Sequence, residues 1–147
     1  MRARRHIRSE HGQTAVEFAL VAPLLVVLLL AILQLGVAFN SYVTLTDATR
    51  AGARKAILQR LNGTGGDVTC AANDTNTICQ TVRGAGGSLD TSKLQVSASS
   101  TDWDTPGSDV TVTATYPYTL SLIKWTGAWV GWSGTYTITT TAKERLE

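Results

Sequence analysis

Histidine is missing from nearly the whole sequence. Its two copies, His6 and His11, both precede Gly12. Because histidine is the commonest general base and the commonest metal ligand in proteins, most hydrolases and histidine-bound metal centres are excluded from the rest of the chain. Lysine-based hydrolysis lacks a supporting motif as well. We therefore expect no enzymatic activity, no catalytic residue, no cofactor and no metal. The lysines after residue 62 are Lys93, Lys124 and Lys143.

An excess of positive charge is also missing once residues 1–12 are set apart. The chain has 13 Lys and Arg against 11 Asp and Glu, a formal net charge of +2. Four of these basic residues and one acid lie in residues 1–12, which leaves nine basic residues against ten acids in the remainder. That remainder has no excess of basic residues to bind nucleic acid, so nucleic acid is not an expected partner.

Ionisable side chains are absent over 22 residues, from Phe18 to Phe39. At a rise of about 1.5 Å per residue, a helix of this length covers about 33 Å, which exceeds a hydrocarbon core of about 30 Å. The first basic residue after the run is Arg50, whereas several arginines precede it. The positive-inside rule then predicts a cytoplasmic N-terminus, a membrane span over 18–39 surrounded by lipid, and an extracytoplasmic remainder. The preceding arginines are Arg2, Arg4, Arg5 and Arg8.

An ordinary secretory signal peptide is the first alternative for this region, because Gly36-Val37-Ala38 offers a site of small residues for cleavage. However, the apolar run is longer than the usual signal-peptide core of about 7 to 15 residues, and the helical pattern continues through that site. A plain membrane anchor that is never cut is the second alternative.

Cysteine is scarce, with only Cys70 and Cys79. Both lie beyond the span, on the side of the membrane where a disulfide can persist. Closing so short a loop would restrain the denatured chain by about 2 to 3 kcal/mol. We expect a disulfide, the alternative being two buried thiols.

Helix-breaking residues are few up to Asn62-Gly63, so the sequence predicts one long helix over residues 13–61 with a single bend at Pro23. One side of its second half carries a stripe of mostly small residues within about 80° of one another. Small residues let another helix approach closely, and we expect this stripe to pack against helices of a filament. Ile57 and Leu61 point to the opposite side, toward the head. The stripe consists of Leu45, Ala48, Gly52 and Ala56.

Residues 63–147 form the expected extracytoplasmic head, which begins with a loop region that contains the ring from Cys70 to Cys79. Alternating apolar and polar residues then predict three antiparallel strands. One face of this sheet, rich in Thr and Ser, is expected to be solvated and the other to lie on the long helix. The fold class is therefore α+β, with a long N-terminal helix and a small three-stranded head. The strands are expected near 93–100, 109–117 and 134–143.

Two groups of side chains in the head have competing interpretations. Three tryptophans recur at helical spacing; burial in the core is favoured, and a contact surface for a neighbour or ligand is the alternative. Three aspartates near the hairpin turn at Pro106-Gly107 match no calcium-loop spacing, and turn chemistry explains them. The tryptophans are Trp125, Trp129 and Trp132, and the aspartates are Asp102, Asp104 and Asp109.

The residues around the start of the apolar run resemble a type IV prepilin processing site. A basic leader, Gly12, four small or medium residues and Glu17-Phe18 precede the run. The pattern is most similar to the Flp/Tad (tight adherence) kind, in which the aromatic residue is usually Tyr. Two further segments, 44–54 and 142–147, are similar to TadE-like minor pilins. The resemblance is strong over residues 9–56 and weak over 63–132.

This resemblance implies cleavage by a membrane-embedded prepilin peptidase between Gly12 and Gln13, on the cytoplasmic side. The mature chain would then join other pilins through the Tad/Flp assembly platform of the inner membrane and reach the pilus at the cell surface. A carboxylate at Glu17 is costly at the edge of the bilayer. The new amine of Gln13 on a neighbouring subunit can compensate for it.

Two functions follow as hypotheses. The first is a structural minor pilin that supports pilus biogenesis, adherence or a related secretion process. The alternative is an uncleaved, single-pass surface module that binds a ligand through its tryptophan-rich segment.

Overall fold

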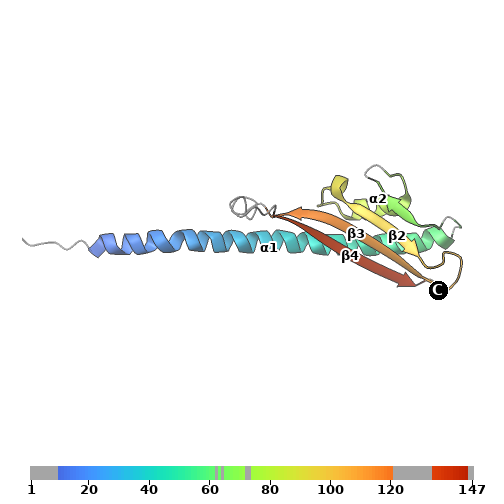
Figure 1. Cartoon of the computed structure of the whole chain (residues 1–147), viewed down its shortest axis with the longest axis horizontal. Coiled ribbons are helices and arrows are strands. Elements are labelled where there is room, and N and C mark those ends of the chain that lie inside the picture. Colours follow the sequence, from blue (N-terminus) through green and yellow to red (C-terminus); the bar gives the residue numbers. More distant parts are fainter. Residues whose placement is uncertain (1–9, 62, 64, 72–73, 121–133, 146–147) are drawn as a thin grey trace, which may run out of the picture.

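The computed structural model describes residues 10–61, 63, 65–71, 74–120 and 134–145. A long N-terminal helix leads into a head made of a second helix and an antiparallel sheet (Figure 1). The fold class is therefore α+β, as predicted. The elements are α1 (Glu10–Leu61), β1 (Val68–Cys70), α2 (Thr77–Ala85), a short 3-10 helix (Thr91–Lys93), β2 (Gln95–Ser100), β3 (Asp109–Thr119) and β4 (Thr135–Arg145).

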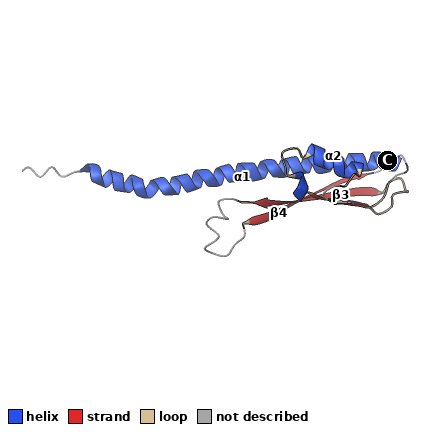
Figure 2. Cartoon of the chain, turned by 90° about the horizontal axis from the view of Figure 1, so that it is seen from above, coloured by secondary structure: helices blue, strands red, loops and turns tan. Residues whose placement is uncertain are grey.

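Helix α1 is 52 residues long and continues through Pro23. Its length is about 78 Å at the standard helical rise. The helix contains a candidate membrane span by length and composition, and no other described residue covers the most apolar part of that span. The second half of α1 lies along the head (Figure 2).

Among the described residues, the sheet has four strands in the order β1-β2-β3-β4, and every neighbouring pair is antiparallel. The prediction of three strands was therefore wrong by one. The missed strand, β1, has only three residues and pairs Val68 with Ala98 and Cys70 with Val96. Three residues are too few for an alternating pattern to stand out from a loop. The three longer strands lie close to their expected positions.

Helix α2 replaces part of the expected loop. Asn76 caps its first turn, where the Asn76 side chain accepts a hydrogen bond from the backbone N–H of Ile78 at 2.9 Å. One face of the helix is buried, and it contacts α1. The head thus covers α1 with a helix as well as a sheet. The buried residues of α2 are Ile78, Cys79 and Val82.

The core lies between α1 and the inner face of the sheet. Alternate residues of β2 and β3 are buried there, as period-two strands require. The opposite face of these strands carries Thr and Ser, so the predicted division into a helix-covered face and a polar face is confirmed. The core residues from β2 and β3 are Val96, Ala98, Val110, Val112 and Ala114.

Candidate functional site

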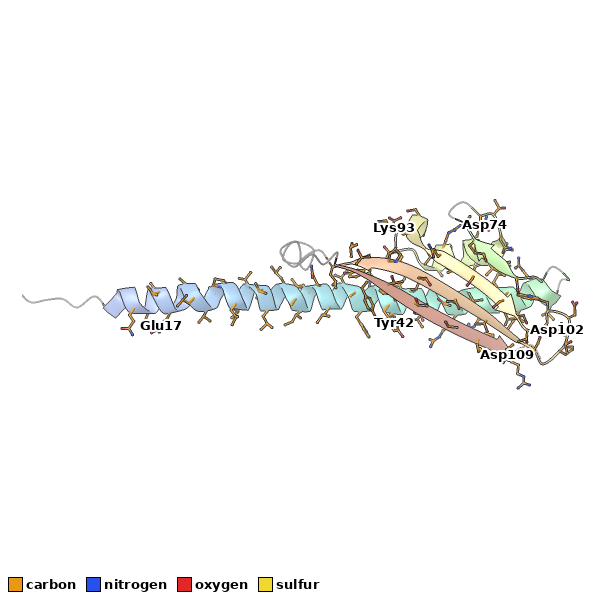
Figure 3. All side chains as sticks on the ribbon, viewed as in Figure 1. Glu17, Tyr42, Asp74, Lys93, Asp102 and Asp109 are labelled. Atoms are coloured by element: carbon orange, nitrogen blue, oxygen red, sulfur yellow. A yellow bond between two sulfur atoms is a disulfide. The ribbon has the colours of Figure 1, made fainter. Side chains whose placement is uncertain are left out.

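The expected processing site lies in the first turns of α1, at the end of the helix far from the head (Figure 3). Gly12, Gln13 and Glu17 are all exposed. Gln13 Nε2 lies 3.4 Å from Glu17 Oε1, and the pair is separated by one helical turn. The structure therefore brings the residue after the expected cut and the expected assembly residue onto one face of the helix.

Within the described part of the chain, no other element covers the apolar surface of α1 beyond the head. From Val16 to Phe39 the large apolar side chains that are exposed retain between 39% and 75% of their accessible surface. Monomeric soluble proteins rarely expose so large a contiguous apolar surface. This half of the helix is therefore suited to lipid or to neighbouring apolar helices.

The stripe at Leu45, Ala48, Gly52 and Ala56 has a different partner from the one predicted. All four residues are buried, and they pack within the head of the same chain. A Cβ atom at Gly52 would clash with the Val82 side chain of α2. The small residues do allow a second helix to approach, but that helix is α2, so in this conformation the stripe is not available to a neighbouring subunit.

The end of the same helix also departs from expectation. Ile57 packs against the core at its margin, whereas Leu61 is 67% exposed. The head is therefore held by the small-residue side of α1, and only Ile57 of the predicted opposite pair contributes.

The disulfide between Cys70 and Cys79 is present and ties the end of β1 to α2, with a Cα–Cα distance of 5.8 Å. The guanidinium of Arg83 on α2 donates to the backbone oxygens of Ala71 and Asp74, which both lie in the segment between β1 and α2. Both ends of the ring between the two cysteines are therefore fixed to α2. The sequence predicted the bond itself, but not the helix to which it is anchored.

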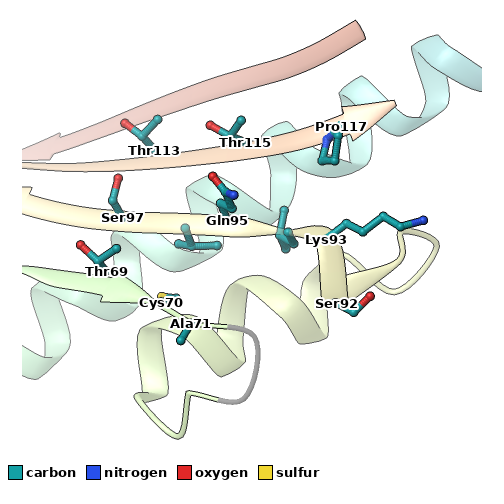
Figure 4. A pocket seen from close by; sticks show the side chains of 12 residues that line it. Thr69, Cys70, Ala71, Ser92, Lys93, Gln95, Ser97, Thr113, Thr115 and Pro117 are labelled. Carbon is teal, nitrogen blue, oxygen red and sulfur yellow. The ribbon is translucent and has the colours of Figure 1, made fainter. Parts of the chain in front are cut away.

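The outer face of the sheet forms an open hollow of about 680 Å³ (Figure 4). Five of its twelve lining residues carry hydroxyl groups, and Lys93 lies at one side. Lys93 Nζ lies 3.1 Å from Asp90 Oδ2, and this hydrogen bond raises the pKa of the lysine. A protonated lysine donates hydrogen bonds and does not act as a general base, so Lys93 offers the hollow a cationic donor. Its labelled hydroxyl residues are Thr69, Ser92, Ser97, Thr113 and Thr115.

One of the aspartates near the hairpin turn, Asp102, stabilises the loop through its carboxylate. Asp102 Oδ1 accepts from the backbone N–H of Asp104 at 2.9 Å, and its other carboxylate oxygen accepts from Thr105. Among the described residues, no three Asp, Glu, His or Cys side chains gather in a way that could hold a metal ion. The tryptophans Trp125, Trp129 and Trp132 lie outside the described residues.

A second cleft, of about 310 Å³, lies where α1 leaves the head. Its lining is mainly apolar and combines Leu35, Ala38 and Tyr42 of α1 with Tyr118 and Tyr136 of the β3–β4 hairpin. Sequence reasoning did not single out these tyrosines. The available signal was Tyr42, which follows closely on the last residue of the apolar run.

The comparison with protein families finds a match within helix α1. Residues 12–54 match the family model described as TadE-like protein. The first part of the chain is similar to TadE-like proteins. The matched segment contains Gly12, Glu17 and most of the buried stripe, so the resemblance to TadE-like pilins of the Flp/Tad system is confirmed there. No curated protein and no solved structure matches the chain. Similarity to this family and the apolar helix together indicate a membrane-anchored protein related to the Tad pilus.

Proposed function

We propose that this protein is a structural minor pilin of a Tad/Flp-type pilus, cleaved after Gly12 and assembled through α1. The observation that carries the proposal is the division of α1 into two halves. The first half is a bare apolar rod, and the second half is part of the core of the head. A single continuous helix therefore joins a membrane-compatible segment rigidly to a folded head.

The bare half of the helix has two suitable environments, lipid and a bundle of similar helices. Lipid tails are as apolar as leucine, so moving the helix from lipid into a bundle gains little hydrophobic free energy. Helix association then depends on packing and polar contacts. A specific charge pair at one level of the helix can supply both affinity and axial register.

Glu17 is suited to that role by its position. Cleavage after Gly12 would make Gln13 the first residue, with a cationic amine below about pH 7.7 to 8.0. Glu17 would then lie close to the N-terminus of the helix, where the helix dipole also favours a negative charge. In the proposed filament, the Glu17 carboxylate of one subunit pairs with the Gln13 amine of the next.

The proposal includes an orientation and a set of partners. Residues 1–12 lie in the cytoplasm, the span crosses the inner membrane and the head lies outside. The partners are the prepilin peptidase, the Tad/Flp inner-membrane assembly platform, other pilins of the same filament and membrane lipid. The protein itself acts as a structural subunit, without catalytic chemistry.

The first test is the intact mass of the protein isolated from host cells that contain an active prepilin peptidase. The expected mass lacks residues 1–12, and Gly12→Val should restore the full-length mass. Persistence of the full-length wild-type species would overturn the proposal in favour of an uncleaved, membrane-tethered binding module.

The second test separates cleavage from assembly. Glu17→Ala should be cleaved normally but should be lost from sheared pilus fractions. Asp47→Ala is the matched control, because Asp47 is an exposed acid on the same helix and forms only a surface pair with Arg50 at 3.8 Å. Equal recovery of both variants in the pilus fraction would contradict the assembly role of Glu17.

A further inference from the structure

The cleft between α1 and the β3–β4 hairpin lies beside the membrane-facing half of the helix. Leu35 and Ala38 form one wall, and both belong to the apolar run that ends at Phe39. Tyr118 and Tyr136 belong to the other wall. Figure 2 shows the hairpin diverging from α1 toward this end. The hairpin therefore reaches back alongside residues that are apolar enough to lie in the bilayer.

The depth of this cleft in the bilayer follows from its position along α1. Leu35 lies four residues before Phe39, which corresponds to about 6 Å of helix. On α1 the cleft runs from Leu35 to Tyr42, so it extends across the end of the apolar run at Phe39. That depth corresponds to the boundary between lipid headgroups and acyl chains rather than to bulk water.

The opposite end of the span agrees with this position. Glu17 and Leu35 are 18 residues apart, or about 27 Å along the helix, close to a hydrocarbon core of about 30 Å. If the outer boundary of the hydrocarbon is at Leu35, the inner boundary falls at Glu17. The carboxylate then reaches the cytoplasmic interface, where the cost of charge is lower than at the bilayer centre.

The chemistry of the cleft also matches a bilayer interface. Three tyrosines from different elements meet there, and Tyr42 and Tyr136 remain 48% and 65% exposed. Tyrosine is enriched at the level of lipid headgroups because its ring is apolar and its hydroxyl is polar. Leu120 adds apolar surface at the same end of the hairpin. The exposed tyrosines lie next to the exposed apolar residues of α1, so the lipid-facing surface of α1 extends onto the head.

We propose that this cleft seats phospholipid of the outer leaflet, so that the tyrosine-lined end of the β3–β4 hairpin is an interfacial anchor. The anchor holds the head at a fixed height on the membrane before the subunit enters a filament. The inference depends on the proposed membrane span, since the cleft lies at the outer boundary only if α1 crosses the bilayer.

The test uses the full chain in phosphatidylcholine and phosphatidylglycerol vesicles at low protein-to-lipid ratio. A spin label is placed by Tyr136→Cys, and its collisions with oxygen and with a water-soluble nickel chelate are compared. Glu144→Cys is the matched control, because Glu144 lies on the same face of β4 at its distal end. We expect a severalfold higher oxygen-to-nickel collision ratio at position 136 than at position 144.

A second labelled site is needed because Tyr136→Cys removes one of the tyrosines of the proposed anchor. Thr137→Cys leaves all three tyrosines intact and labels an exposed residue that also lines the cleft. It should show the same preference for oxygen. If the labels at positions 136 and 137 match the label at 144, the cleft is aqueous and the inference is wrong.

Two further outcomes distinguish the possible causes of failure. Leu28→Cys, in the middle of the bare helix, reports the span itself. If the label at 28 lacks a preference for oxygen, the membrane span fails and the anchor fails with it; if only the hairpin labels lack it, the anchor alone fails. If the hairpin labels lose their preference for oxygen when the protein is diluted with lipid, a second copy of the chain occupies the cleft and the inference is wrong.

Discussion

Gly52 of α1 lies directly against Val82 of α2, with no room for even one methyl group between them. This contact is where the long helix meets the helix that carries one end of the disulfide. It places α2 close enough to α1 to bury Ile78 and Val82 almost completely.

Replacing Gly52 by Ala should therefore destabilise the head. The added methyl group has to displace the Val82 side chain or separate the two helices, and overpacking of this kind costs about 1 to 3 kcal/mol. Chemical denaturation of the full chain in detergent micelles, followed by near-ultraviolet circular dichroism, measures the change.

Two other glycines provide controls for this substitution. Gly84 in α2 and Gly36 in α1 have open space where a Cβ atom would be placed. In both helices alanine is favoured over glycine by up to about 1 kcal/mol. Gly84→Ala and Gly36→Ala should thus be neutral or stabilising, and a loss of stability equal to that of Gly52→Ala would show that the close contact is not the cause.

The disulfide supports a second prediction. Cys70→Ser with Cys79→Ser should lower the free energy of unfolding by about 2 to 3 kcal/mol, because the crosslink restrains the unfolded chain. The two cysteines lie 9 positions apart in the sequence. Denaturation of the double variant beside the oxidised wild type gives the difference. If the crosslink is the source, reduced wild type should match the variant; equal stability of the oxidised wild type and the variant would contradict the prediction.

The parts of the fold that the sequence predicted share a long, regular pattern. The apolar run can be identified without knowledge of the tertiary structure. The alternation in β2 and β3 continues long enough to identify strands and their buried face. Strand β1 and helix α2 lack such length. The signal available for α2 was the cap at Asn76, followed by apolar residues at Ile78 and Val82. It was missed because the region between the two cysteines was expected to be a loop.

Predictions about the site differ in the same way. The spacing of Gly12 and Glu17 is local, so sequence alone can identify it. The stripe at Gly52 is also visible, but small residues show only that something approaches closely, not whether it belongs to the same chain. The cleft at Tyr136 depends on a hairpin folding back beside α1, which is a tertiary relationship that no short pattern records.

The pair of Asp90 and Lys93 leads to a prediction about titration. Ser92 Oγ donates to Asp90 Oδ1 at 2.6 Å, and this bond, followed by the one from Lys93, lowers the pKa of Asp90. A lowered pKa in the folded state stabilises the fold above the unfolded pKa of about 3.9, and this contribution is lost as pH falls through the folded pKa.

The order of these two causes can be measured. The pKa of Asp90, followed by carboxyl carbon chemical shifts, should rise more in Ser92→Ala than in Lys93→Ala. The backbone N–H of Ser92 still donates to the carboxylate at 3.2 Å in both variants, so the pKa should remain below its ordinary value. A larger rise in Lys93→Ala would identify the charge as the main cause instead.

A buried pair of hydroxyl groups joins α1 to the last strand and supports the final prediction. The Oγ1 atoms of Thr49 and Thr140 lie 2.7 Å apart, and Thr49 Oγ1 donates to the backbone oxygen of Leu45 at 2.6 Å. Because the single hydroxyl hydrogen of Thr49 is used in that bond, Thr140 must be the donor to Thr49. The two threonines therefore have unequal roles.

Thr49→Val removes the acceptor and leaves the Thr140 hydroxyl unsatisfied at a site only 6% exposed, which should cost about 1 to 3 kcal/mol. Thr140→Val should cost less, because Thr49 keeps its bond to Leu45. The double variant replaces both hydroxyl groups with methyl groups of similar shape, so it should be more stable than Thr49→Val alone. A double-mutant cycle by denaturation in micelles measures this coupling. If the loss of stability in the double variant equals the sum of the two single losses, the coupling is contradicted. Two independent packing defects would give such a sum, whereas a shared hydrogen bond makes Thr140→Val favourable once Thr49 is already Val.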